Sequence, residues 1–94
     1  MKELKDLTPA EKAVLIVAYY TLDRSLSSHQ PKQRFLKKII EMNPKVKKKA
    51  FNSLVSNGFL RKHPTGRNTT YELTKKGLKA ADKIIKENFN HSYN

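Results

Sequence analysis

The segment from residue 43 to residue 58 constrains the fold more than any other part of this sequence. Asn43 is a favoured N-cap residue, and Pro44 suits the first position of a helix, where no backbone donor is needed. Gly58 is the residue type that most readily adopts the left-handed conformation that ends a helix. We therefore predict a helix over about residues 44–57.

Directly after this helix, the sequence has the pattern of a β-hairpin. Residues 59–63 and 69–73 are rich in strand-forming side chains, and residues 64–68 between them are mostly turn-forming types. Thr74 then offers a cap for a C-terminal helix over about residues 75–89. The expected order is helix, hairpin over about 59–73, and helix.

The N-terminal part of the chain predicts a first helix. Thr8-Pro9-Ala10-Glu11 fits a capping box with proline at the first helical position. The apolar run 13–20 could be a buried strand on composition alone, but the cap and the length to about Asp23 favour a helix. A polar loop with a short strand near Leu26 follows.

A second helix is expected from residue 31 or 32 to about Glu41. Its inward-facing residues would be Phe35, Leu36, Ile39 and Ile40. Only about two residues would separate it from the helix at Pro44, which is the tight turn of a helix-turn-helix. The predicted fold is a single α+β domain over residues 1–94, mostly α: a winged helix-turn-helix with a three-helix core, a hairpin wing and a C-terminal helix.

Positive charge is concentrated in the middle of the chain, whose formal net charge is +12. Residues 31–49 hold eight basic side chains and one acidic side chain (8 − 1 = +7), and residues 50–71 hold three basic and no acidic ones (+3). Such clustering indicates a face that binds a polyanion, because solubility alone requires only dispersed charge.

The predicted helix over 44–57 can be sorted by angle at about 100° per residue. One broad arc is apolar, and the opposite arc consists of hydrogen-bonding side chains without an acid. That polar arc contains Lys45, Lys48, Lys49, Asn52 and Ser56. A helix in the major groove needs such a face, with lysines for phosphates or guanine and an amide for adenine. The alternative is an ordinary solvated lysine face, but such faces usually mix Glu with Lys. Lys47 points toward the core side and could extend past the second helix.

Further basic side chains flank this helix. Arg61 and Lys62 lie in the first strand of the hairpin, and Arg67 lies near its tip, where it could reach an adjacent minor groove. Lys37 and Lys38 would contact the phosphate backbone if the second helix crosses it. For each of these side chains, an incidental surface charge is the alternative interpretation.

The region GFLRK…TTYELTKKG resembles the wing of MarR/PadR-like winged-helix proteins. The matching positions are Leu54, Gly58, Phe59, Leu60, Arg61, Tyr71, Leu73, Thr74 and Gly77. The resemblance implies that the helix over 44–57 is a recognition helix and that the hairpin is a wing. The chain lacks the long additional helices of full MarR regulators, and its size is closer to small archaeal chromatin proteins and archaeal viral regulators.

Catalysis and cofactor binding have no support in the sequence. Cysteine is absent, and His29, His63 and His91 are scattered without a carboxylate at a useful spacing. We expect no enzyme activity, no cofactor and no metal. The apolar run 13–20 is too short to span a bilayer, so no membrane is expected and the predicted location is the cytoplasm, in association with the nucleoid.

Apolar surface on the first and last helices predicts a homodimer. The interface residues would be Leu15, Leu78, Ile84, Ile85 and Phe89. The alternative is that the two helices cover each other within one chain.

The predicted function is binding of double-stranded DNA, as a transcriptional regulator or a nucleoid-associated protein. Asn52 and Arg67 would read sequence, and the lysines would supply affinity. Two alternatives remain: an RNA-binding protein that uses the same basic surface, and a winged-helix module that binds other proteins.

Overall fold

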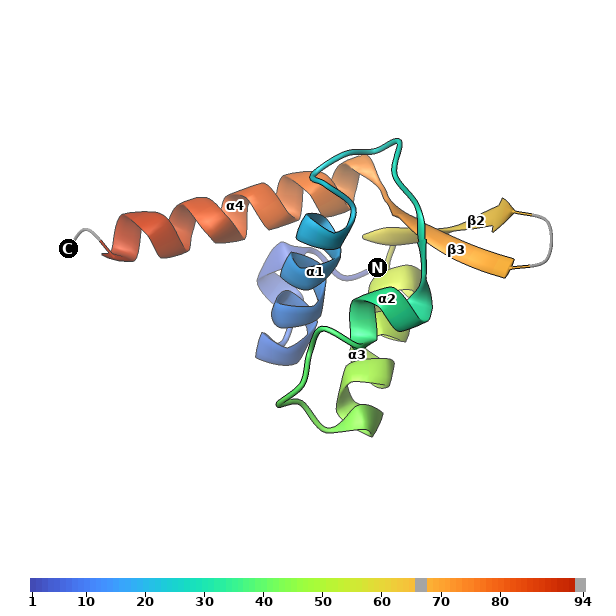
Figure 1. The fold of residues 1–94 in the computed structure, drawn as a ribbon. Coiled ribbons are helices and arrows are strands. Elements are labelled where there is room, and N and C mark those ends of the chain that lie inside the picture. The colour runs from blue at the N-terminus through green and yellow to red at the C-terminus, as the bar shows by residue number, and fades with distance from the viewer. Residues whose placement is uncertain (66–67, 93–94) are drawn as a thin grey trace.

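The computed structural model describes residues 1–65 and 68–92. These residues form a mostly helical α+β structure with a small antiparallel sheet, which confirms the predicted class (Figure 1). The elements are η1 (Leu4–Asp6), α1 (Pro9–Thr21), β1 (Gln30–Pro31), α2 (Lys32–Leu36), α3 (Pro44–Ser56), β2 (Leu60–Thr65), β3 (Asn68–Leu73) and α4 (Lys75–Ser92). In Figure 1, α1 lies in the centre with α3 and α4 on either side of it, and the hairpin β2–β3 extends from one end.

The capping box at the start of α1 is present, and the apolar run 13–20 is helical as expected. The Thr8 hydroxyl accepts a hydrogen bond from the Glu11 amide at 3.1 Å, and the Glu11 carboxylate accepts one from the Thr8 amide at 2.9 Å. These two bonds satisfy backbone donors that a strand would have paired with a neighbour.

The second helix differs from its prediction. It ends at Leu36 and not near Glu41, and residues 37–43 separate α2 from α3. The predicted two-residue turn is therefore wrong. The carbonyl oxygens of Leu36 and Ile39 instead accept hydrogen bonds from the Lys47 ammonium, both at 2.9 Å. Ile40 is 88% exposed and does not face inward as predicted.

The third helix has the predicted start and end. The Asn43 side chain accepts a hydrogen bond from the Lys45 amide at 2.8 Å, and Pro44 occupies the first turn. At the other end, Gly58 has φ of +79°, the left-handed conformation that favours glycine.

The sheet has the strand order β1-β3-β2. The pairing of β2 with β3 runs from Leu60↔Leu73 to Thr65↔Asn68, so the strands extend into the predicted loop 64–68. Strand β1 pairs with β3, with Gln30 opposite Tyr71. It begins four residues after Leu26, near which a short strand was expected.

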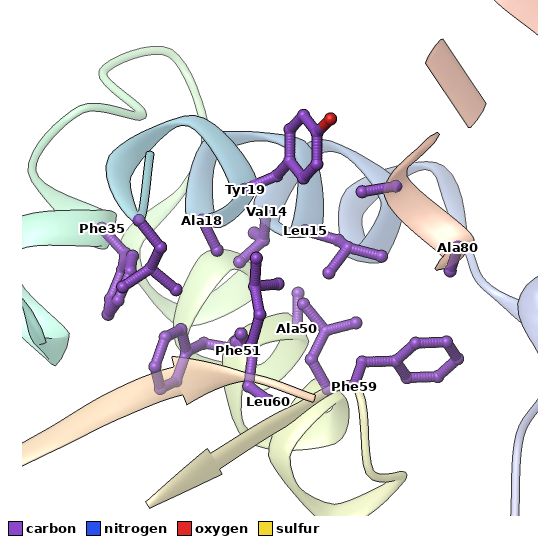
Figure 2. Packing of buried hydrophobic residues seen from close by; sticks show 14 of the residues in the cluster. Val14, Leu15, Ala18, Tyr19, Phe35, Ala50, Phe51, Phe59, Leu60 and Ala80 are labelled. Atoms are coloured by element: carbon purple, nitrogen blue, oxygen red, sulfur yellow. The ribbon is translucent and has the colours of Figure 1, made fainter. Parts of the chain in front are cut away.

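The core lies between α1, α3 and the sheet (Figure 2). The Phe51 ring stands at its centre, 5.5 Å from the Phe35 ring and 4.8 Å from the Tyr71 ring between centroids. A Cβ atom on Gly77 would lie 2.0 Å from the carbonyl oxygen of Phe59, so only glycine allows α4 to approach this closely.

The first and last helices cover each other within the chain. Leu15 is fully buried and Ile84 is 6% exposed, so the prediction that these two side chains form a dimer interface is wrong. Leu78 and Ile85 are half-buried against the same core, and the side chain of Phe89 lies outside the described residues. No helix among residues 1–65 and 68–92 is both long enough and apolar enough to cross a membrane.

Candidate nucleic-acid interface

The predicted polar arc of α3 is a solvent-exposed surface. We call it the basic arc; it consists of Lys45, Lys48, Lys49, Asn52 and Ser56, all of which are exposed. The buried side chains of α3 are Ala50, Phe51 and Leu54, on the opposite side of the helix. In the part of the chain that the structure describes, no ion pair involves the lysines of the basic arc. Their charges are therefore available to an external anion.

Asn52 is already engaged within the chain. Its side-chain oxygen accepts a hydrogen bond from the Lys32 ammonium at 2.9 Å, and that ammonium lies 5.3 Å from the centroid of the Phe51 ring. Bidentate recognition of adenine needs both the amide oxygen and the amide nitrogen. The Asn52 oxygen has a second lone pair, so it can accept a hydrogen bond from adenine either beside Lys32 or in its place.

Lys47 has a structural role. It is half-buried, and its ammonium donates to two carbonyl oxygens at the end of α2 and in the following turn. Lys47 therefore points toward the core side and not into the basic arc, as its position around the helix predicted. Its two hydrogen bonds join α3 to the end of α2 and to the following turn. Lys37 and Lys38 lie exposed in this turn between α2 and α3.

A network on the inner side of α3 fixes its orientation relative to α1. Glu11 is 3% exposed, and its carboxylate accepts hydrogen bonds from the Ser53 hydroxyl and from the Lys2 ammonium, the latter at 2.9 and 3.1 Å. Burial alone would raise the pKa of Glu11. The bonds from Ser53, Thr8 and Lys2 outweigh burial and lower this pKa to about 2. The sequence indicated only the capping role of Glu11, because Ser53 is 42 residues away.

The two basic residues of β2 point to opposite faces of the sheet, as neighbours in a strand do. Lys62 is paired in register with Tyr71 on the core side and is exposed. Arg61 lies on the other face and forms an ion pair with Glu72, with Nη2 and Nε at 2.8 and 2.9 Å from Oε1. Arg61, which the sequence predicts as a DNA contact, is thus engaged by a carboxylate within the chain. Arg67 lies outside the described residues.

Strand β1 brings the start of α2 beside the hairpin, which the sequence did not indicate. A shallow groove lies between the two elements and is lined by Pro31, Lys32, Gln33, Asn68, Thr69 and Tyr71. Polar side chains at this junction were missed because a two-residue strand has almost no sequence signal.

Two histidines that are distant in sequence meet on the outer face of the sheet. The rings of His29 and His63 are stacked, with centroids 4.2 Å apart and an angle of 8° between the planes. The Thr70 hydroxyl lies 3.1 Å from His29 Nδ1 and donates to the His63 carbonyl oxygen at 2.9 Å. Within residues 1–65 and 68–92, no group of three or more metal-ligating side chains comes together.

Comparisons with protein-family models, with curated proteins and with solved structures find no match to this chain.

Proposed function

We propose that this protein binds double-stranded DNA as a winged helix-turn-helix of the MarR/PadR-like type, acting as a transcriptional regulator or a nucleoid-associated protein. The observation that carries the proposal is the basic arc: an exposed, acid-free surface on a helix that is capped at its start and held to α1 by the bond from Ser53 to Glu11. In this proposal α3 is the recognition helix and β2–β3 is the wing.

The dimensions of α3 suit this role. With 13 residues it is about 20 Å long at 1.5 Å per residue, and a major groove about 12 Å wide admits an α-helix. Lys45, Lys48 and Lys49 would contact phosphates or guanine edges. Lys37 and Lys38 would hold the backbone beside α2, and Lys62 would contact it from the wing.

The test is a titration of a duplex of about 20 base pairs by fluorescence anisotropy at several salt concentrations. With about six phosphate contacts, log K falls against log salt with a slope near −5. The variant K48E/K49E removes two contacts, so the slope of log K against log salt changes to about −3.6 and the affinity drops at least tenfold.

The matched control is K12E/R24E, which changes the net charge by the same amount at two residues outside the basic arc. This control should keep the wild-type slope and bind within about threefold of wild type. Equal losses in the two variants would show that net charge alone, and not α3, governs binding. Preference for a double-stranded RNA hairpin over the DNA duplex would favour the RNA-binding alternative. If the wild-type protein shows no affinity for either nucleic acid, a protein-interaction module is favoured.

A further inference from the structure

A second basic surface lies on α4, whose first turn adjoins the end of α3 through the bond from the Lys76 ammonium to the Asn57 carbonyl oxygen. We call it the α4 face; it consists of Lys5, Lys75, Lys79, Lys83 and Lys86. All five side chains are exposed, and none of them forms an ion pair within the described part of the chain. The proposed DNA contacts through α3 leave this surface unused.

Helix α1 separates the two surfaces (Figure 1). Ala10 and Glu11 line a groove together with α3, whereas Ala13 and Ile16 line a groove together with α4. At about 100° per residue, Glu11 lies about 160° from Ala13 and about 140° from Ile16 around α1. The helices α3 and α4 therefore flank α1 from opposite directions.

The lysines of α4 point away from α1. The buried residues of this helix are Gly77, Ala80, Ala81 and Ile84, and they face the core. Lys75, Lys79, Lys83 and Lys86 fall on the opposite arc when the helix is sorted by angle. Since α3 also turns its basic arc away from the core, the molecule presents two separate basic surfaces.

A groove also adjoins the α4 face. A depression of about 580 Å³ lies between η1 and α4, with Leu4, Phe59 and Ala80 among its lining residues. On the η1 side it is bordered by Lys5 and by Glu3, whose carboxylate is neutralised by the Lys76 ammonium at 3.3 Å. Lys76 holds the N-terminal segment against the start of α4 at this depression. The Lys76 ammonium donates to the carbonyl oxygens of Lys2 and Asn57 at 2.5 and 2.9 Å. The free lysines of the α4 face therefore border a surface whose shape is set by internal bonds.

We propose that the α4 face binds a second segment of duplex DNA, so that one molecule bridges two duplexes. This inference rests on the proposed function of α3. Lys75, Lys79 and Lys83 are four residues apart, hence about 6 Å apart along the helix axis. From Lys75 to Lys86 the row extends over about 16 Å, a length over which a duplex carries about ten phosphate charges.

Duplex DNA fits this face better than an acidic protein does. Protein interfaces have an apolar centre, and the large apolar side chains exposed in the described residues lie elsewhere. They are Met1, Tyr20, Leu26, Ile40 and Val46. The apolar side chains near this face line the depression beside the lysines, and the exposed row of lysines itself matches a uniform line of phosphates.

The experiment compares two variants of equal charge, K75E/K79E/K83E on α4 and K45E/K48E/K49E on α3. Each lowers the net charge from +12 by six units, to +6. Sedimentation with excess duplex of about 16 base pairs measures how many duplexes one protein molecule binds. A bead assay measures whether an immobilised duplex captures a second, labelled duplex. Circular dichroism checks that both variants are folded.

We expect wild-type protein to form a complex of one protein molecule with two duplexes and to capture the labelled duplex. Each variant should bind one duplex, and capture should fall at least tenfold in both. A wild-type complex that saturates at one duplex, or undiminished capture by K75E/K79E/K83E, would overturn the bridging role while leaving the α3 proposal intact. The bridging role would also be overturned if K45E/K48E/K49E, which retains the α4 face, bound a polyglutamate peptide more tightly than duplex DNA. That result would favour an acidic protein as the partner of the α4 face. Loss of all duplex binding in the wild type would instead refute the function proposed for α3.

Discussion

Asn52 shows how a single side chain can have one role within the chain and another toward a ligand. Its amide oxygen holds Lys32 of α2, and its position within the basic arc exposes it to a major groove in the proposed complex. Breaking an exposed hydrogen bond of this kind costs about 1 kcal/mol, which a bidentate contact with adenine, worth about 1–3 kcal/mol, can offset. A wrong base would leave the bond to Lys32 in place, so breaking it with the correct base would reduce the discrimination by the cost of that bond.

Substitution of Asn52 tests this role. We expect Asn52→Ala to reduce the ratio of affinities for a preferred and a random duplex by about tenfold, because only specific binding uses the amide. Lys37→Ala is the comparison: as a phosphate contact it should weaken binding to both duplexes by the same factor. Gel-shift titrations with a selected duplex and a scrambled duplex measure both ratios. If both variants leave the ratio unchanged, Asn52 is not a base reader.

At the scale of the elements, the sequence predicted those whose boundaries are set locally. The cap at Asn43 and the stop at Gly58 define α3, and Thr8 defines the start of α1. The elements that were wrong or missed depend on distant partners. Helix α2 ends early where Lys47 bonds its carbonyl oxygens, and β1 exists through pairing with Tyr71, 41 residues along the chain. Local patterns do not contain such contacts.

Lys47 therefore provides a test of how α2 is held against α3. We expect Lys47→Met, which keeps the apolar stem and removes the ammonium, to lower the free energy of unfolding by about 1–2 kcal/mol. Urea denaturation measures this change, and hydrogen exchange should increase in residues 36–40. Lys48→Met is the matched control: one residue further along α3, it is exposed and should change stability by less than about 0.5 kcal/mol. Similar effects of the two substitutions would contradict the role given to Lys47.

For the whole molecule, the buried carboxylate of Glu11 links parts that the sequence keeps far apart. It joins the N-terminal segment through Lys2, α1 through the Thr8 cap, and α3 through Ser53. Lys2 extends the link, since its amide donates to the Asn57 side chain at 2.8 Å. The orientation of the basic arc relative to the rest of the protein thus depends on a buried charge beside α3, in the groove that Glu11 and Ser53 line with Lys49. Neither proposed DNA contact surface includes this network.

Acid should therefore weaken the fold through Glu11. Its pKa is about 2 in the folded protein and 4.5 in its ordinary state, so the folded protein favours the carboxylate. The resulting stabilisation, about 3 kcal/mol, is fully present above about pH 5 and is lost as the pH falls from about 4.5 toward 2. Glu11→Gln should lower the free energy of unfolding at pH 7 by about 2–3 kcal/mol and should remove most of the decline between pH 5 and pH 2.5. Urea denaturation of both proteins across this range measures the difference. A decline in Glu11→Gln as steep as in the wild type would assign the acid sensitivity to other carboxylates.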